Sequence, residues 1–380
     1  RITVFLRTWY TFDLQLDTGS PLAPGSLALS PTFSAISKLT PTRSPKPVYR
    51  DDASGWLFEA SDRERAALSD LSAELLVPLP GRHRLAGVIA LGPKRSEQPY
   101  SKADRQMLQS VASQTGLALE NAELLENLTS EVAQRERISR EIEIAREVQE
   151  RLFPQSYPHI PGLDLAGFCR PAQAVGGDYY DFFPLSDARL ALALGDISGK
   201  GISAALLMAS LRASLRSIAG LQLGDLASLI SHVNNLVYES STTNRYATFF
   251  YAEYDPFTRL LTYVNAGHNP PYVLRGTQAI PLEATGTVIG LLPGAVYAQA
   301  TIPMHPGDVL LVFTDGISEA MSNDDEEWGE DRMLATAQQL LAKPDCTARQ
   351  ILSRIVEAAD TFTAGAPQHD DMTLLICTIS

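Results

Sequence analysis

Cysteine is scarce in this sequence: only three of its 380 residues are cysteines, Cys169, Cys346 and Cys377. They are odd in number, lie far apart and have none of the short spacings of metal-binding cysteine pairs. A disulfide framework and a zinc site are therefore not expected. Free thiols in a reducing compartment are expected instead, which predicts a cytoplasmic location.

Positive charge is also in short supply, because 31 Lys and Arg residues face 44 Asp and Glu residues and leave a formal net charge of −13. Such an acidic chain repels the phosphates of nucleic acids and anionic lipids, so we expect neither as a partner. No hydrophobic run reaches the roughly 18 residues that span a bilayer, and no signal peptide is visible. Since the chain begins at Arg1, we expect it to belong to a longer protein, whose upstream part could include a membrane anchor.

What the sequence does have is enough apolar residues, 45% of the total, for two or three hydrophobic cores. Residues 1–116 predict a mixed α/β domain, because two short β-like runs lie at 73–80 and 85–92. The polar, proline-rich stretch at 39–55 predicts a loop.

Residues 117–152 predict a highly charged helix that links two domains. Ser101 and Asp104 form a variant of the capping box upstream of it, and Pro154 follows its end. Its apolar residues recur at spacings near three and four and are interrupted by polar residues at 133–137. They are Leu117, Leu124, Leu128, Ile138, Ile142, Ala145 and Leu152. Two interpretations stay open: a single amphipathic helix lying on a domain, or a short parallel coiled coil joining two protomers. We favour the coiled coil because both flanks are compact domains.

Residues 153–380 contain repeated β-like runs with helical patterns between them. The runs at 247–255 and 260–267 are separated by a turn at Asp255-Pro256. Such hairpin-like spacing favours an antiparallel sheet with packed helices, an α+β arrangement, over strict βαβ alternation. The helical patterns lie near 201–219, 224–240, 331–342 and 347–361.

A glycine-containing stretch at 190–211, LALALGDISGKGISAALLMASL, has the outline of a phosphate-binding loop. The pattern G-x-x-x-x-G-K-[ST] needs its spacing because backbone N–H groups wrap the phosphates and the hydroxyl reaches Mg²⁺. Here Gly195 and Gly199 are one residue too close, and Gly201 takes the place of the hydroxyl residue. We therefore do not expect nucleotide hydrolysis.

Aspartates stand at the ends of several β-like runs. Asp196 and Asp315 follow such runs, Asp370 and Asp371 precede one, and Asp178 comes after two glycines. In one antiparallel sheet these ends would share an edge. Several carboxylates there would repel one another unless cations lay among them, and all-oxygen ligands select Mg²⁺ or Mn²⁺. Any one of these aspartates could be ordinary turn chemistry, but together they favour a metal site.

Six motifs in order resemble the SpoIIE/RsbU-type branch of the metal-dependent protein serine/threonine phosphatases, the PPM or type 2C superfamily. They are AREVQERLFP, GGDYYDFF, GDISGKG, NAGHNPP, FTDGISEA and HDDMTLL, and they cover about 145–380. The preceding part, with ELLVPLP, LAGVIALG and YSKADRQMLQSVASQTGLALENAELLENL, more loosely resembles a GAF sensor domain. The resemblance implies an α-β-β-α sandwich at 153–380 with a two-metal centre on one edge, behind a GAF-like α/β domain at 1–116 and the helical linker.

Carried over motif by motif, the resemblance implies two Mn²⁺ or Mg²⁺ ions per phosphatase domain. Asp178 and Asp196 would bind one ion together with the backbone carbonyl of Ile197. Asp196 would bridge to the second ion, which Asp315 and Asp370 would complete. A water between two such ions becomes a hydroxide-like nucleophile near neutral pH and can attack phosphorus in line. No phosphoenzyme is then needed, so no cysteine has to act.

The resemblance further implies a phosphorylated protein as substrate, with phosphoserine or phosphothreonine on an anti-sigma-factor antagonist of the STAS type. It implies regulation by the sensor domain, and we expect a homodimer formed through the GAF-like domain and the linker helix. Two rival functions stay open. One is a phosphatase fold that binds a phosphoprotein without turnover, and the other is a nucleotide-binding signalling protein.

Other residues near the motifs receive weaker expectations. His268 could be a general acid but is more often a residue that fixes a turn, and Lys200 could contact phosphate or be exposed at a helix start. Asp181 and Asp371 could support the proposed ligands from outside the metal shell. We expect Glu319 at the start of a helix rather than on the metal.

The helix predicted to follow Gly201 suggests a regulatory hypothesis. It begins five residues after Asp196, so a small rotation of it would move the loop at 196–197. A signal from the GAF-like domain could reach this helix through the linker. Equal turnover and equal metal affinity with and without residues 1–120 would contradict this idea.

Overall fold

The computed structural model describes most of the chain as two compact units, Arg1–Glu136 and Arg137–Ser380. Each unit is described by itself. Most of the loop predicted at 39–55 lies outside the described residues. The structure describes residues 1–7, 12–18, 28–29, 48–50, 62–82, 84–185, 189–220, 225–241, 245–341 and 346–380.

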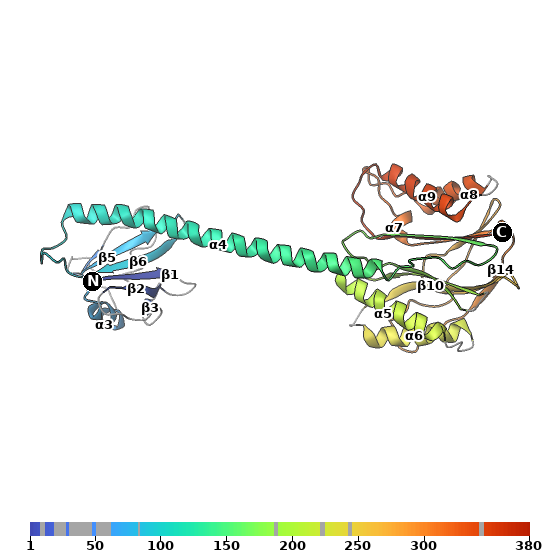
Figure 1. Ribbon diagram of the computed structural model, residues 1–380, viewed down its shortest axis with the longest axis horizontal. Coiled ribbons are helices and arrows are strands. Elements are labelled where there is room, and N and C mark those ends of the chain that lie inside the picture. Colours follow the sequence, from blue (N-terminus) through green and yellow to red (C-terminus); the bar gives the residue numbers. More distant parts are fainter. Residues whose placement is uncertain are drawn as a thin grey trace. The chain divides into compact units, whose positions relative to one another are not determined.

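The first unit is built on an antiparallel sheet with the strand order β3-β2-β1-β6-β5-β4 (Figure 1). Its elements are β1 (Ile2–Arg7), β2 (Phe12–Asp17), β3 (Ala28–Leu29), β4 (Val48–Tyr49), α3 (Asp62–Asp70), β5 (Leu75–Pro80) and β6 (Leu85–Leu91). The runs predicted at 73–80 and 85–92 are β5 and β6, which pair along their whole length. Phe5, Phe12 and Leu14 are fully buried in its core. The predicted mixed α/β fold is confirmed.

A single helix, α4 (Lys102–Glu150), follows this sheet. The predicted capping box starts it: the Asp104 N–H donates to Ser101 Oγ (3.2 Å), and the Ser101 N–H donates to Asp104 Oδ2 (2.7 Å). The helix is longer than predicted because the last helical pattern of the sensor region and the linker pattern run together without a break. Many apolar side chains of α4 are exposed, among them Leu124 (54%) and Leu128 (57%).

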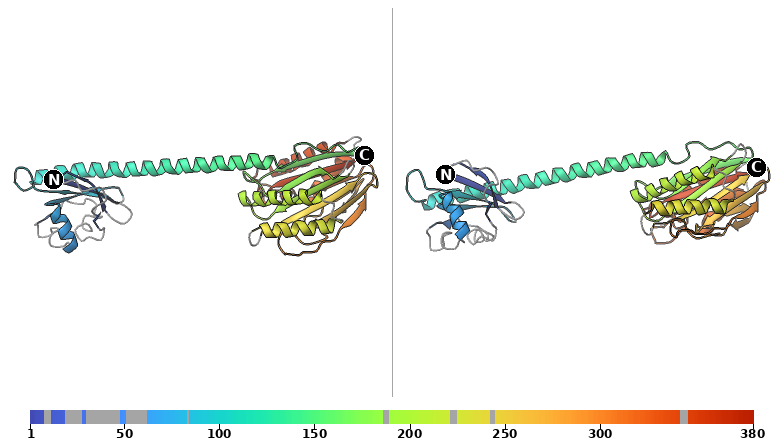
Figure 2. Two further views of the ribbon diagram at one scale, coloured as in Figure 1. Left: turned by 60° about the horizontal axis from the view of Figure 1, so that its bottom comes forward. Right: turned by 90° about the horizontal axis from the view of Figure 1, so that it is seen from below.

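The second unit is a sandwich of two five-stranded antiparallel sheets with helices on both outer faces (Figures 1 and 2). One sheet has the order β14-β11-β10-β9-β8 and is covered by α5 and α6; the other has the order β13-β12-β15-β16-β7 and is covered by α7, α8 and α9. This is the α-β-β-α sandwich that the resemblance implied. The strands are β7 (Leu163–Arg170), β8 (Tyr179–Pro184), β9 (Leu190–Ile197), β10 (Ala247–Asp255), β11 (Leu260–Ala266), β12 (Tyr272–Arg275), β13 (Gln278–Pro281), β14 (Ala300–Pro303), β15 (Val309–Phe313) and β16 (Met372–Ile379). The helices are α5 (Ile202–Ala219), α6 (Leu226–Ser240), α7 (Asp315–Ser318), α8 (Glu330–Leu341) and α9 (Ala348–Thr363).

The alternation of side chains along β9 explains how the layers pack. Leu190, Leu192 and Leu194 point into the core between the two sheets, while Ala191 and Ala193 face the helices α5 and α6. Successive strand residues point to opposite faces, so the large side chains fill the inter-sheet space and the small ones allow helices to approach. Every one of these five residues is fully buried.

The structure corrects the expectation that the aspartates share an edge of one antiparallel sheet. β9, which carries Asp196, belongs to one sheet, whereas β15 and β16 pair with each other in the other sheet. The carboxylates therefore meet because the two sheets stack with these strand ends on the same side. The hydrophobic pattern identified the strands but carried no information about their sheet.

Helix α5 is long and apolar enough to cross a membrane by composition alone, with a mean hydropathy of 1.3 over 18 residues. Its apolar residues Leu207, Met208, Leu211 and Leu215 are instead buried against the sheet beneath it. A core helix under a sandwich layer has this composition for packing reasons.

Candidate metal centre

Four separate segments bring the predicted aspartates to one end of the sandwich. Asp178 directly precedes β8 and is 1% exposed. Asp196 is the last but one residue of β9, Asp315 is the first residue of α7, and Asp370 stands two residues before β16. Each of the two sheets contributes, so the site depends on the complete sandwich rather than on one local loop.

The Ile197 carbonyl, predicted as a ligand, lies next to the loop that carries Asp178. A Cβ atom on Gly177 would come within 2.8 Å of this oxygen. Glycine is therefore required where the loop passes the end of β9. The structure thus places the carbonyl of Ile197 beside Gly177, the residue before Asp178.

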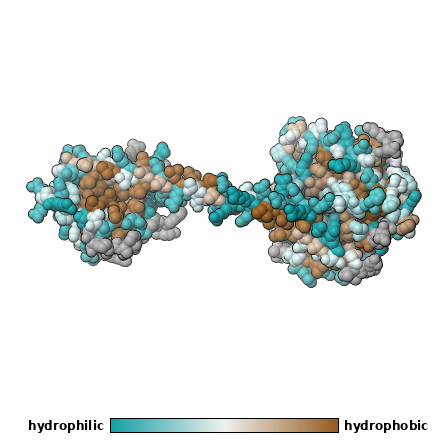
Figure 3. All heavy atoms as spheres, viewed as in Figure 1, coloured by the Kyte–Doolittle hydropathy of each residue, from teal (hydrophilic) through white to brown (hydrophobic). Residues whose placement is uncertain are grey.

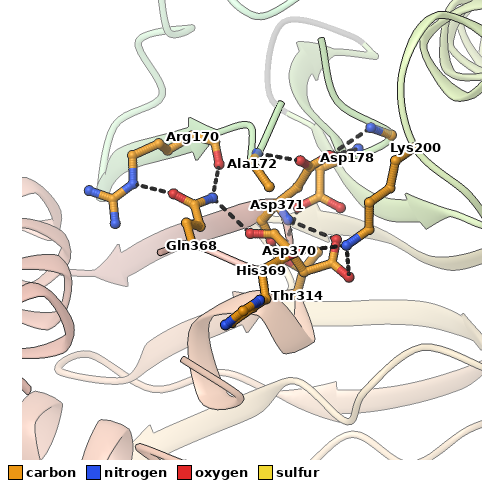
Figure 4. A network of polar contacts seen from close by, with 10 residues as sticks. Arg170, Ala172, Asp178, Lys200, Thr314, Gln368, His369, Asp370 and Asp371 are labelled. Carbon is orange, nitrogen blue, oxygen red and sulfur yellow. Dashed lines mark hydrogen bonds and ion pairs between the residues drawn. The ribbon is translucent and has the colours of Figure 1, made fainter. Parts of the chain in front are cut away.

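Asp371 is a structural partner of the same loop. Its Oδ1 accepts a hydrogen bond from the Ala172 N–H (2.7 Å), and its Oδ2 accepts from the N–H groups of Gly177 (2.6 Å) and Asp178 (3.3 Å), as Figure 4 shows in part. A side chain at Gly176 would clash with this carboxylate. The second Asp of HDD therefore fixes the backbone on which Asp178 stands, which agrees with the supporting role expected for it.

Thr314 ties Asp178 to the other sheet, a contact that sequence reasoning missed. Its hydroxyl donates to Asp178 Oδ2 (2.8 Å) and accepts from the Thr373 N–H (3.0 Å) (Figure 4). Thr314 caps α7 directly before Asp315. The signal in the sequence is the threonine of FTDG, directly before Asp315.

Lys200 joins two loops of the site. Its Nζ lies 3.1 Å from Asp370 Oδ2 and donates to the carbonyl of His369 (Figure 4). The loop after Asp196 is also held by Arg245, which donates to the Ser198 carbonyl and to Ser203 Oγ, both at 2.9 Å. Lys200 is thus exposed just before the start of α5, as one alternative expected, and its side chain reaches the rim of the site.

His268 is a buried hydrogen-bonding residue. Its ring lies 2.8 Å from Thr248 Oγ1 through Nδ1 and 2.9 Å from the Phe313 carbonyl oxygen through Nε2. Since a carbonyl only accepts, Nε2 must be the donor and Nδ1 accepts from the threonine. Burial lowers the pKa of His268 to about 4, so the ring is neutral at pH 7. This agrees with the turn-fixing role that we favoured.

Two expectations about neighbouring carboxylates are wrong. Asp181 faces α5 and not the candidate ligands: it accepts two hydrogen bonds from the Arg216 guanidinium, both at 2.7 Å, and one from the Tyr179 hydroxyl. The alternation of β8 explains this, because residues three positions apart lie on opposite faces. Glu319 caps the C-terminal end of α7 rather than the start of a helix, since that helix is only one turn long.

The electrostatics of the site are those of crowded carboxylates. Burial, followed by repulsion from Asp196 and Asp371, raises the pKa of Asp178 well above its usual range. Burial and repulsion from Asp315 and Asp370 raise the pKa of Asp196 to about 7. The pKa of Asp315 is raised for the same two reasons. Such mutual destabilisation is relieved when cations bind among the groups.

The donor set fits hard divalent cations. One oxygen of Asp315, Oδ1, is buried and has no hydrogen-bond partner among the described residues. Buried carboxylate oxygens normally have partners, so this one is available to a ligand. Within the described parts of the chain, no three His, Cys, Asp or Glu side chains are already drawn together tightly enough to hold an ion.

A cavity of about 520 Å³ opens beside these carboxylates. Its lining includes Lys200, Gly316, His369 and Asp370, and Met321 supplies apolar surface. A pocket with a few polar groups at one end and apolar surface at the other is suited to a side chain that carries a charged group.

Comparison with known proteins gives consistent matches. The family model of stage II sporulation protein E (SpoIIE) matches residues 186–380, slightly more than half of the chain, and a GAF domain model matches residues 40–121. The SpoIIE match includes Asp196, Asp315 and Asp370, whereas Asp178 lies upstream of it.

Two curated relatives are about a quarter identical to this chain over the aligned residues. Protein IcfG of Synechocystis sp. is 27% identical over 263 residues, which are 62% of this chain and 41% of the relative. The phosphoserine phosphatase RsbU of Bacillus subtilis is 27% identical over 270 residues, which are 69% of this chain and 75% of the relative. The chain thus spans only about two fifths of the length of Protein IcfG.

Solved structures agree on the fold of the second unit. The SiaA-PP2C domain of Pseudomonas aeruginosa superimposes with a TM-score of 0.58 at 20% identity and covers 65% of this chain and 98% of that domain. The PP2C phosphatase domain of SpoIIE from Bacillus subtilis, solved with a fragment of its regulatory domain, gives 0.50 at 22% identity and covers 57% of this chain and 63% of that structure. The likeness establishes a shared sandwich fold.

Proposed function

The chain belongs to the SpoIIE family, and from this premise we propose that it is a metal-dependent phosphatase that hydrolyses phosphoserine or phosphothreonine on a partner protein. The observation that carries the proposal is the cluster of Asp178, Asp196, Asp315 and Asp370 at one end of the sandwich. Their pKa values are raised in three of the four cases, and one buried oxygen of Asp315 has no partner among the described residues. Such a set is costly to the fold unless it binds cations.

Two divalent ions, Mn²⁺ or Mg²⁺, are proposed for this centre. Asp178, Asp196 and the Ile197 carbonyl would hold one ion, and Asp196, Asp315 and Asp370 would hold the other. When bound, a pair of such ions activates water and offsets the charge on phosphoryl oxygens. RsbU and RsbP of Bacillus subtilis, both named phosphoserine phosphatases, support this chemistry by their similarity.

The chain's own residues prepare the site in three ways. Thr314 and Asp371 hold Asp178 in place through its side chain and its backbone. Lys200 supplies positive charge at the rim, beside Asp370, where a phosphate would enter. The neutral ring of His268 fixes the end of β15 through the Phe313 carbonyl, directly before the segment that carries Asp315. Positioning and charge are what phosphoryl transfer requires of a protein.

The substrate is proposed to be a phosphorylated anti-sigma-factor antagonist of the STAS type. Similarity to RsbU supports a phosphoprotein substrate in this class of pathway. The cavity beside the carboxylates, about 520 Å³, is large enough for a phosphorylated side chain. We further propose a cytoplasmic enzyme, which the three free thiols support.

The proposed architecture has a sensor domain at 1–116, a linker at 117–152 and a phosphatase domain at 153–380, with two chains associated through α4. The exposed apolar residues of α4 support this association. In Figure 3 the exposed part of α4 is apolar, then hydrophilic, then apolar again. Glu131 and Arg135, both exposed on α4, form an intrahelical ion pair (2.8 Å).

The experiment that tests the activity is phosphate release from a small aryl phosphate at neutral pH. It compares the wild type with Mn²⁺, the wild type with chelator, and Asp315→Asn with Mn²⁺. We expect release only in the first case, with a loss of at least about 100-fold in the variant, because the Asp315 carboxylate holds one ion. The matched control is Asp324→Asn, which makes the same change at an exposed loop residue.

A second reading of the same samples separates the alternatives. Mn²⁺ should raise the melting temperature of the wild type and of Asp324→Asn, and less so that of Asp315→Asn. Stabilisation by Mn²⁺ without any turnover, tested also on a phosphoserine protein, would favour the rival function of a phosphoprotein-binding module. If Mn²⁺ neither stabilises the wild type nor supports turnover, the proposed metal centre is wrong.

A further inference from the structure

Gln149, in the last turn of α4, makes an unusual pair of contacts. Gln149 is only 5% exposed. Its Nε2 donates to the Gly176 carbonyl (2.7 Å), and its Oε1 accepts from the Gly176 N–H (3.0 Å). One carboxamide thus satisfies both backbone polar groups of a single residue, as a neighbouring strand would.

Gly176, the residue that Gln149 holds, lies close to the candidate metal centre, because it comes two residues before Asp178. The opposite side of this loop is held by Asp371, whose Oδ2 accepts from the Gly177 N–H (2.6 Å). Gly176 has no side chain of its own, and a Cβ there would clash with Asp371. The loop is therefore positioned from outside, between Gln149 on one side and Asp371 on the other.

The residues that follow α4 hold the other flank of Asp178. The ring of Phe153 stacks on Tyr180, with ring centroids 5.3 Å apart and an angle of 25° between the planes. Tyr180 comes two residues after Asp178, on β8. The end of α4 and the turn behind it therefore contact the chain on both sides of Asp178.

We propose that Gln149 is a positioning residue that fixes the backbone at Gly176 and thereby sets Asp178 for metal binding. The inference rests on the proposed function and adds a residue of the linker helix to its machinery. A carboxamide is suited to this role because it has a donor and an acceptor at one end. The supporting contacts of metal ligands typically change metal affinity by about 10- to 100-fold when they are removed.

The test uses the full chain and three variants. Gln149→Met keeps the length of the side chain but makes neither hydrogen bond. Gln149→Glu keeps the acceptor for the Gly176 N–H and, when ionised, has no donor for the carbonyl. Gln134→Met makes the matched change at an exposed position of α4. Three quantities are measured: the Mn²⁺ dissociation constant by calorimetry, amide hydrogen exchange at residues 174–178, and the urea midpoint of unfolding.

We expect Gln149→Met to bind Mn²⁺ at least about tenfold more weakly than the wild type and to exchange the Gly176 amide faster in the metal-free state. Gln149→Glu should keep the protection of the Gly176 amide. Its Mn²⁺ affinity should lie between that of the wild type and that of Gln149→Met. Gln134→Met should match the wild type in all three quantities. A role limited to general stability would lower the urea midpoint while leaving Mn²⁺ affinity and local exchange unchanged.

Wild-type Mn²⁺ affinity together with wild-type exchange in Gln149→Met would overturn the proposal. If that variant does not fold, Gln149→Glu decides alone: equal Mn²⁺ affinity and equal exchange throughout 174–178 would then overturn it. Failure of the proposed function looks different, because the wild type itself would then neither bind Mn²⁺ nor release phosphate. The exchange measurement on the metal-free chain would still report on the clamp.

Discussion

At the scale of single residues, the site separates side chains that would bind ions from side chains that hold them in place. Asp178, Asp196 and Asp315 have raised pKa values, and Asp315 also has a buried oxygen without a partner among the described residues. Asp370 is instead paired with Lys200. Asp371, Thr314 and Gln149 are instead engaged by hydrogen bonds to backbone or side chain near Asp178. The carboxylates of the candidate ligands repel one another. The supporting residues hold Asp178 and its loop in place despite this repulsion.

His268 gives a prediction about the pH dependence of stability. Its folded pKa of about 4 lies below the ordinary histidine value of 6.5, so between these values the unfolded chain binds more protons. Stability contributed by the neutral ring is therefore complete above pH 6.5 and is lost as the pH falls toward 4. His268→Gln can keep both hydrogen bonds through its amide and cannot titrate. We expect the wild type to lose roughly 3 kcal/mol relative to this variant between pH 7 and pH 4.

The free energy of unfolding of the wild type has to be compared with that of His268→Gln at each pH, because the titration of Asp196 changes stability in the opposite sense. Its folded pKa of about 7 exceeds the ordinary aspartate value of 3.8, so the metal-free protein loses stability as the pH rises between these values. Urea unfolding of the wild type, His268→Gln and the exposed control His159→Gln, without metal, isolates the histidine. Parallel curves for the wild type and His268→Gln would mean that the ring is not buried as a neutral donor and acceptor.

The residues that sequence reasoning missed share one property: their partners are distant along the chain. Thr314 contacts Asp178 across 136 positions, and Gln149 contacts Gly176 across 27. The aspartates were predictable because their motifs carry the signal locally, in GGD, GDISGKG, FTDG and HDD. A threonine or glutamine in such a motif becomes informative only when the fold shows what it touches.

At the scale of elements, the long strands were predictable and the short ones were not. The run predicted at 247–255 is β10, and the helix predicted near 201–219 is α5 (Ile202–Ala219). The four-residue strands β12, β13 and β14 were missed because so few residues do not establish an alternation. Sheet membership also could not be read from the chain, since β9 and β15 have equally apolar patterns and belong to different sheets.

Helix α4 carries the prediction that belongs to this scale. Leu117 and Leu124 lie seven residues apart, Leu128 follows four residues later, and all three are exposed. Placed at a and d of heptads, they would be covered by the same helix of a second chain. We expect the wild type to be a dimer in light scattering at micromolar concentration. Leu124→Glu, which puts a charge into the seam, should shift the equilibrium at least about tenfold toward monomer.

The control for this variant is Asn127→Glu, which adds the same charge to an exposed position of α4 outside the a and d positions. It should leave the mass unchanged. Equal masses for Leu124→Glu and the wild type would leave the alternative interpretation, in which α4 is a single amphipathic helix and its apolar stripe has another purpose.

At the scale of the whole molecule, one continuous helix is shared by both compact units. The division between them falls between Glu136 and Arg137, inside α4 and next to the ion pair of Glu131 and Arg135. The last turn of the same helix carries Gln149, which holds the loop of the candidate metal centre. We therefore propose that a change in α4 near Arg135 reaches Asp178 through Gln149, in addition to the route through α5 that the sequence suggested.

Insertions into α4 between Arg135 and Glu136 test this transmission. Each added residue rotates the following helix by about 100°, so two residues turn it by roughly 200°, whereas seven residues return it to within about 20° and preserve the heptad register. If the sensor unit acts through the rotation or register of α4, the two-residue insertion should change turnover by at least about fivefold. The seven-residue insertion should resemble the wild type. Equal turnover and equal Mn²⁺ affinity in all three proteins would mean that α4 is a tether, and that any regulation of the phosphatase unit reaches it by another route.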